Sequence, residues 1–128
     1  MSIKLFRVIL PVSSVERAAS FYGLVLGMPG ERVSGGRHYF HCGETILACF
    51  SPREDGDDFD LPSNPDHIYF SLPDLEAVFA RCRKAECARL DDAIETRPWG
   101  ERSFYAEDPF GNKLCFVDER TVFTGQRS

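Results

Sequence analysis

The sequence contains an internal repeat. A stretch beginning at Arg7 (RVILPVSSVERAASFY) and one beginning at His67 (HIYFSLPDLEAVFARC) align without a gap at an offset of 60 residues. The first half of each stretch has the composition of a strand, and the second half places apolar residues at the i, i+3, i+4, i+7 spacing of one buried helix face. A repeat of this kind predicts two copies of one supersecondary unit in a single chain.

Three strand-like segments follow each predicted helix. They are GERVS, RHYFHC and TILACF in the first half, and AIETRP, ERSFYA and KLCFVD in the second, with DPFGN as a tight turn. Each half is therefore expected to be a β-α-β-β-β module. Ser13 and Asp74 are the expected N-caps of the two helices. We predict an α+β fold in which the two tandem modules form a curved, mixed eight-stranded sheet around a cavity.

The expected organisation is one domain over residues 1–128. Its parts are module 1 at about 3–51, a linker at 52–65 rich in Asp, Pro, Ser and Gly, module 2 at about 66–119, and a tail at 120–128.

Composition limits the classes of partner. Hydrophobic residues make up 43% and charged residues 27%, and no apolar run approaches the roughly 20 residues of a membrane span, so we expect a soluble cytoplasmic protein without a membrane partner. The net charge of −5 and the lack of a basic stripe argue against nucleic acid. The five cysteines contain no CxxC pair, and a disulfide framework is not expected in the cytoplasm. A small molecule is the expected partner.

Strand alternation predicts which side chains face a cavity. In the first and fifth strands the uniformly apolar sets, such as Val8 with Leu10 and Ile68 with Phe70, are assigned to the helices. The opposite face is then mixed. It is predicted to carry Arg7, Leu47, Cys49, His67, Tyr69 and Cys115.

Together these motifs resemble the vicinal oxygen chelate superfamily, which includes glyoxalase I, extradiol dioxygenases and bleomycin-resistance proteins. The resemblance rests on LPVSSVERAASFYGLVLGMP, HIYFSLPDLEAVFARC and FYAEDPFGNKLCFVDE and covers residues 3–119. It implies a metal site with ligands on the first, fourth, fifth and eighth strands, typically His or Gln, Glu, His and Glu. The corresponding positions here are Arg7, Leu47, His67 and Cys115.

These residues make a poor metal site. Of the four, His67 alone keeps the residue type that the resemblance implies. Arg7 repels a cation, and Leu47 has no lone pair to donate. No cofactor is therefore expected. The alternative is a divalent metal at a rearranged site that uses His67 and Cys115, with Cys49 as a third ligand.

The other candidate site residues carry two interpretations each. Arg7 either binds an anionic or planar ligand, or pairs with an acidic side chain or reaches solvent. His67, with Tyr69 beside it, is either a ligand-binding or proton-transferring residue or a hydrogen-bonded structural one. Trp99 either stacks on a flat ligand or closes one end of the core. Arg102 is placed near the cavity, where it suits an anionic or aromatic ligand.

Three functions remain open. The first is metal-free binding of a small planar or anionic organic compound, of the resistance or sequestration type, in a homodimer. The second is a lyase, isomerase or dioxygenase that uses a rearranged metal site, or His67 and Tyr69 as acid and base. The third is an interaction module with a vestigial cavity.

Overall fold

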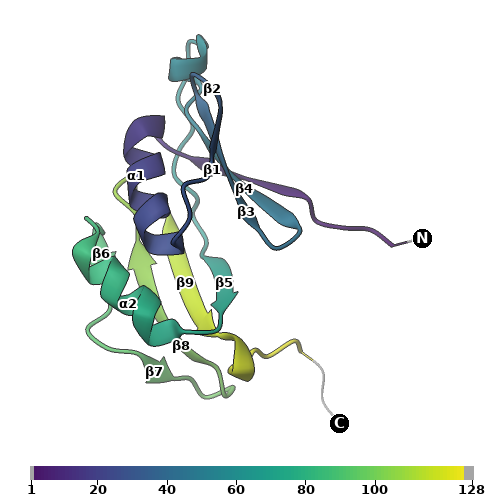
Figure 1. Cartoon of the computed structure of the whole chain (residues 1–128), viewed down its shortest axis with the longest axis vertical. Helices are drawn as coiled ribbons and strands as arrows, with labels where there is room; N and C mark the ends of the chain where they lie inside the picture. Colours follow the sequence, from purple (N-terminus) through teal and green to yellow (C-terminus); the bar gives the residue numbers. More distant parts are fainter. Residues whose placement is uncertain (1, 126–128) are drawn as a thin grey trace. The chain divides into compact units, whose positions relative to one another are not determined.

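The computed structural model describes residues 2–125, which form two compact units divided between Asn64 and Pro65 (Figure 1). The division falls within the segment expected to be a linker. Each unit has its own sheet and one helix, and each is described separately below.

The first unit is a four-stranded sheet with one α-helix. Its strand order is β1-β4-β3-β2, with β1 parallel to β4 and the other neighbours antiparallel. The elements are β1 (Arg7–Pro11), α1 (Val15–Leu26), β2 (Glu31–Ser34), β3 (Arg37–Cys42), β4 (Thr45–Phe50) and the 3₁₀ turn η1 (Arg53–Asp55).

The second unit repeats this arrangement in a five-stranded sheet. Its strand order is β5-β9-β8-β6, with β7 also paired to β8, and β5 is parallel to β9. The elements are β5 (Ile68–Leu72), α2 (Leu75–Lys84), β6 (Arg89–Leu90), β7 (Glu95–Thr96), β8 (Arg102–Glu107), β9 (Lys113–Asp118) and the 3₁₀ turn η2 (Glu119–Thr121).

The prediction of an α+β fold with two β-α-β-β-β modules is confirmed, with two differences. Strand hydrogen bonds within residues 2–125 form a four-stranded and a five-stranded sheet rather than one sheet of eight. The segment AIETRP contributes the short strand β7, and an unpredicted strand, β6, precedes it. The edge is interrupted at Asp91, because its carboxylate accepts the backbone N–H of Tyr105 at 2.9 Å, in place of the backbone carbonyl that a continuous strand would supply.

Side-chain caps fix where the helices begin. Asp74 accepts the backbone N–H of Ala77 at 3.1 Å, as predicted. The first helix is capped by Ser14, whose hydroxyl accepts the N–H of Arg17 at 3.2 Å, so the prediction of Ser13 was wrong by one residue. That helix ends at Gly27, which takes the left-handed conformation with φ 71°.

Aromatic side chains join each helix to its sheet. In the first unit Tyr22 on α1 lies 6.1 Å from Phe40 on β3, measured between ring centroids. In the second unit Phe79 on α2 contacts Phe104 on β8 edge to face at 4.8 Å, and Phe104 stacks on Phe116 of β9 at 5.1 Å. These contacts identify the face of each sheet that its helix covers.

The turn between β8 and β9 is held by a buried carboxylate. Asp108 is fully buried and accepts the backbone N–H groups of Phe110 and Asn112 at 2.9 and 2.8 Å. Gly111 has φ 89°, a conformation that favours glycine. The predicted DPFGN turn is therefore present and aligns β8 with β9.

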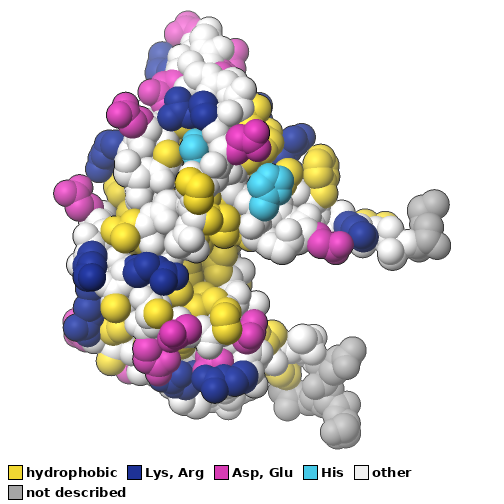
Figure 2. Space-filling view, viewed as in Figure 1, with side chains coloured by type: hydrophobic (Ala, Val, Ile, Leu, Met, Phe, Trp, Pro, Cys, Tyr) yellow, Lys and Arg dark blue, Asp and Glu magenta, His cyan; other side chains and the backbone are white. Residues whose placement is uncertain are grey.

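On the face drawn in Figure 2, basic and acidic side chains are interspersed, with hydrophobic side chains reaching the surface between them. Within the part of the chain described, no helix combines the length and the apolar character that a membrane crossing requires.

Candidate functional site

Strand register divides the second sheet into a face packed on α2 and a face turned away from it, here called the distal face. Because neighbouring residues in register point to the same side, the pairing of Tyr69 with Cys115 and of Cys115 with Tyr105 places all three together. The distal face carries Tyr69, Ser71, Ser103, Tyr105, Cys115 and Val117, and His67, just before β5, joins it through its contact with the Tyr105 ring. The predicted placement of His67, Tyr69 and Cys115 on one face agrees with this register.

Aromatic rings and one guanidinium gather on the distal face. The His67 ring lies 4.8 Å from the ring of Tyr105 and 6.2 Å from that of Tyr69. The guanidinium of Arg97 lies 4.6 Å from the centre of the Tyr105 ring and donates to the hydroxyl of Ser103 at 2.9 Å. Arg97 is already neutralised, since it pairs with Glu95 at 2.9 Å and with Asp91 at 3.5 Å.

Cys115 lies beneath this layer as a neutral thiol. It is 1% exposed, and burial raises its pKa to about 11. Burial likewise raises the pKa of Tyr105. Because a metal binds the thiolate rather than the thiol, Cys115 is a weak donor at neutral pH.

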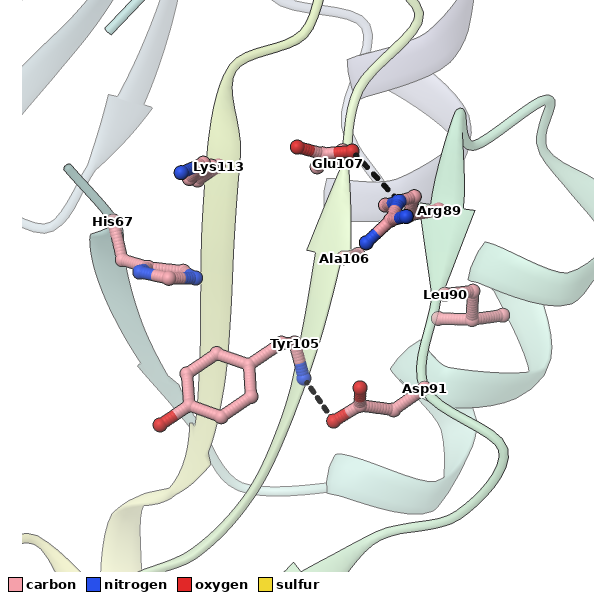
Figure 3. A pocket seen from close by; sticks show the side chains of 8 residues that line it. All are labelled: His67, Arg89, Leu90, Asp91, Tyr105, Ala106, Glu107 and Lys113. Carbon is pink, nitrogen blue, oxygen red and sulfur yellow. Dashed lines mark hydrogen bonds and ion pairs between the residues drawn. The ribbon is translucent and has the colours of Figure 1, made fainter. Parts of the chain in front are cut away.

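Two grooves open on the second unit. The first, of about 530 Å³, is polar and mixed in charge, and Figure 3 shows Lys113 on β9, His67 just before β5, and Glu107 paired to Arg89. Its lining is His67, Arg89, Leu90, Asp91, Tyr105, Ala106, Glu107 and Lys113.

The second groove, of about 460 Å³, is largely apolar, and we call it the Trp99 groove. It brings together Tyr69 and Trp99, two of the predicted ligand-contacting residues. Its lining is Tyr69, Phe70, Ser71, Trp99, Glu101, Val117, Val122 and Phe123.

Two predicted site residues of the first unit lie on the wrong face. Leu47 is in register with Val8, and Cys49 with Leu10, so both are on the side that packs on α1, where they are 3% and 0% exposed. The prediction that they share a face with Arg7 was wrong. In β4 that face carries Ile46 and Ala48, which also lack a donor atom for a metal.

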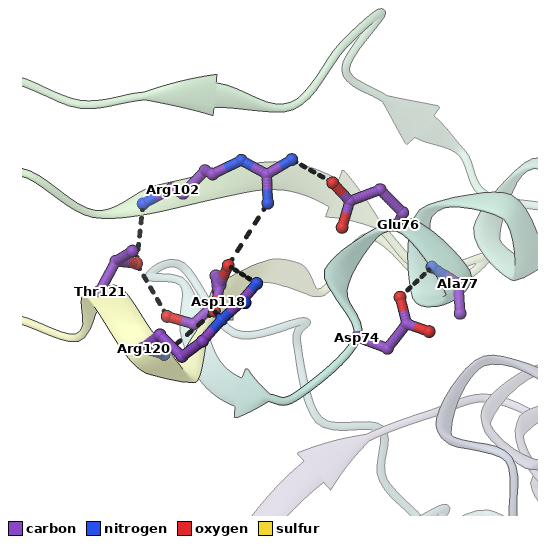
Figure 4. Close-up of polar contacts among 7 residues, drawn as sticks. All are labelled: Asp74, Glu76, Ala77, Arg102, Asp118, Arg120 and Thr121. Atoms are coloured by element: carbon purple, nitrogen blue, oxygen red, sulfur yellow. Dashed lines mark hydrogen bonds and ion pairs between the residues drawn. The ribbon is translucent and has the colours of Figure 1, made fainter.

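Arg102 is also misplaced in the prediction. Arg102 alternates in β8 with the same parity as Phe104 and Ala106, so it lies on the α2 side of the sheet. There it pairs with Glu76 of the helix and, at 3.3 Å, with Asp118 (Figure 4). Arg120 donates to the same Asp118 carboxylate at 2.9 Å. Arg102 therefore stabilises the junction of helix and sheet and does not reach the distal face.

Arg7 is exposed, at the start of β1, and it contacts aromatic side chains. Its guanidinium donates to the hydroxyl of Tyr39 at 3.2 Å and lies 4.9 Å from the centre of the Phe6 ring. Within residues 2–125, no carboxylate lies at ion-pair distance from it. Pairing with an acidic residue is thus excluded for the described residues, and solvent exposure is the alternative that the structure supports.

The residues do not fit the divalent metal that the resemblance implies. Across residues 2–125, no group of three or more His, Cys, Asp or Glu side chains is placed to hold an ion. The His67 ring lies between aromatic rings, and Cys115 is a buried neutral thiol.

Three residues on or beside the distal face were not among the predicted site residues: Tyr105, Arg97 and Asp91. Tyr105 could have been found by alternation, because in RSFYAE the polar Ser103 and Tyr105 alternate with the apolar Phe104 and Ala106. Arg97 and Asp91 carry no such signal, since they lie outside the strands and reach the sheet through side-chain contacts.

A family model described as Glyoxalase/Bleomycin resistance protein/Dioxygenase superfamily matches residues 4–116. No curated protein gives a sequence match.

Solved structures share the fold at low sequence identity. A glyoxalase-related enzyme from Fulvimarina pelagi has a TM-score of 0.75 at 15% identity and covers 98% of this chain and 95% of its own. A glyoxalase/bleomycin resistance protein from Albidiferax ferrireducens T118 has a TM-score of 0.73 at 19% identity, covering 89% and 97%. A lactoylglutathione lyase from Agrobacterium tumefaciens has a TM-score of 0.67 at 22% identity, covering 94% and 97%. At these identities the similarity concerns the fold alone.

Proposed function

Since the chain belongs to the glyoxalase/bleomycin resistance protein/dioxygenase superfamily, we propose that it uses this fold to bind a small planar organic compound without a metal ion. The observation that carries the proposal is the Trp99 groove, where the rings of Tyr69, Trp99 and Phe123 stand exposed beside the buried Val117. Tyr69 is 61% exposed and Trp99 is 47% exposed.

The groove has the properties of a small-molecule site. Its volume of about 460 Å³ lies within the roughly 300–1,000 Å³ of typical ligand pockets. Val117 is buried, while Val122 and Phe123 are 43% and 39% exposed, so a bound planar compound would remove apolar surface from water. The rings of Tyr69 and Trp99 offer it faces for stacking.

Charge favours an uncharged ligand in this groove. Its one charged residue is Glu101, whose carboxylate accepts the Trp99 indole N–H at 2.8 Å and the backbone N–H of Phe123 at 2.9 Å. The nearby Arg97 is engaged by Glu95 and Asp91. Of the planar and anionic classes expected from the sequence, the groove therefore supports the planar one.

The fluorescence of Trp99 provides a direct test, because Trp99 is the single tryptophan of the chain. Titration with a panel of uncharged planar aromatic compounds, in buffer containing a chelator, should change the Trp99 emission saturably for at least one compound. Tyr69→Ala should weaken that compound about tenfold, the value expected for the loss of a stacking contact of roughly 1.4 kcal/mol. Phe59→Ala is the matched control, since Phe59 is 47% exposed but lies outside the groove.

Two results would contradict the proposal. One is a titration in which no compound gives a saturable response that Tyr69→Ala weakens. The other is about one tightly bound divalent ion per chain in the purified protein, lost in His67→Ala, which would favour an enzyme with a rearranged metal site.

A further inference from the structure

Two cysteines meet at the end of α2, outside both grooves. Cys82 lies in the last turn of the helix and is 1% exposed, and Cys87 follows the helix end and is half-buried. The Sγ of Cys87 lies 3.4 Å from the backbone carbonyl oxygen of Cys82, to which its thiol donates.

The surroundings make the two thiols unequal. The hydrogen bond between them lowers the pKa of Cys87 and raises that of Cys82, whose burial raises it further. Among the charged groups, Arg81 lowers the pKa of Cys82 and Asp108 raises that of Cys87, but both effects are smaller than that of the hydrogen bond between the thiols. The accessible sulfur is thus the one that ionises more readily, while the buried sulfur stays protonated beside it.

We propose that Cys82 and Cys87 are a peroxide-oxidisable thiol pair that closes to a disulfide. The Cys87 thiolate attacks one oxygen of the peroxide, the O–O bond breaks, and the released hydroxide takes a proton to become water. Cys87 is then a sulfenic acid. The Cys82 sulfur attacks the Cys87 sulfur, the S–O bond breaks, and the hydroxyl leaves as water with the Cys82 proton. In total, two thiols and one hydrogen peroxide give one disulfide and two waters.

Oxidation would act on the border of the first groove. Cys87 is separated by one residue from β6, whose Arg89 and Leu90 both line that groove. A disulfide to Cys82 would tie the start of this edge strand to the end of α2.

Tryptic digestion makes the disulfide identifiable. Cleavage after Arg81, Arg83, Lys84 and Arg89 releases Cys82–Arg83 and Ala85–Arg89 as separate peptides. After treatment with hydrogen peroxide and blocking of free thiols, the two peptides should appear joined in the unreduced digest and separate after reduction. The intact protein should lose two mass units.

Cys42 is the matched control within the same molecule. It is half-buried like Cys87, but burial raises its pKa. Cys87 should therefore react with iodoacetamide near neutral pH faster than Cys42, because its pKa is lowered while that of Cys42 is raised. In Cys82→Ser, a dimedone-type probe should trap sulfenic acid on Cys87 that the unsubstituted protein converts to disulfide.

Three results would overturn the inference: alkylation of Cys87 no faster than that of Cys42, oxidation of Cys87 to sulfinic acid while Cys82 stays a free thiol, or a disulfide that joins other cysteines. The alkylation and digestion experiments use the unsubstituted protein, so they do not depend on how a variant folds.

Discussion

The position of Leu47 in the register of β4 predicts a large effect on stability. Leu47 is 3% exposed and is in register with Val8 and with the fully buried Phe40, on the side that packs on α1. Leu47→Ala removes three buried carbon groups, worth about 2.4 kcal/mol at about 0.8 kcal/mol each, and the remaining cavity adds to this loss. We expect the free energy of unfolding to fall by about 3 kcal/mol.

The matched variant is Ile46→Ala. Ile46 is the preceding residue of the same strand, points to the opposite face and is half-buried, so its truncation leaves no closed cavity and should cost about 1 kcal/mol. Urea unfolding followed by circular dichroism separates the two, since a slope of about 2 kcal/mol per molar urea converts 3 kcal/mol into a midpoint lower by about 1.5 M. If Leu47→Ala costs no more than Ile46→Ala, the register that turns Leu47 toward the helix is refuted.

Three further predictions follow from burial and backbone contacts. Burial raises the pKa of Cys115 to about 11 from 9.0, so this residue should hold about a hundredfold less thiolate at neutral pH than an ordinary thiol. Cys115 should therefore react with a thiol reagent at least that much more slowly in the native protein than in the urea-unfolded protein, and equal rates would contradict its burial. Hydrogen bonds from Arg120, first among the causes, lower the pKa of Asp118 to about 2 from 3.8. The ionic contacts of Asp118 therefore stabilise the fold fully above about pH 4 and are lost as pH falls toward 2. The stability advantage of the unsubstituted protein over Asp118→Asn should shrink across that window, and an advantage independent of pH would count against this role of Asp118. Gly36→Ala should destabilise the fold by about 1–3 kcal/mol, because the added Cβ would lie 2.3 Å from the Ser51 backbone oxygen. Gly23→Ala lies inside α1 with its nearest contact at 3.5 Å and should stabilise the fold by up to about 1 kcal/mol. Thermal unfolding that ranks the two variants the other way would disprove these contacts.

The fold could be predicted because its signals are local and occur twice. The repeat, the helical spacing and the tight turn each depend on residues within one segment, and the copy at an offset of 60 residues supports the first strand and the helix of each module independently. The strands RHYFHC, TILACF and KLCFVD have the bounds of β3, β4 and β9. The interrupted edge at Asp91 could not be predicted in this way, since it depends on a carboxylate reaching a strand that follows later in the chain.

The two faces of a strand could be told apart only where its alternation is polar against apolar. In β5 the apolar Ile68 and Phe70 alternate with Tyr69 and Ser71, and the sequence by itself determined the distal face. In β4 consecutive residues from Ile46 to Phe50 are all apolar, so the pattern is the same whichever set faces the helix. Pairing with β1 and β3 decided that face, and it turned Leu47 and Cys49 inward.

The tertiary structure also decided which charged and aromatic groups meet. A long side chain such as Arg102 reaches whichever partner the packing brings near, and α2 supplies Glu76 on the side away from the expected site. Trp99 lies in a loop without periodicity, and folding alone places it beside Tyr69. The sequence determined the modules and the residue types at the family positions, whereas packing between distant segments determined the site, because local alternation contains no information on which strand or helix lies opposite.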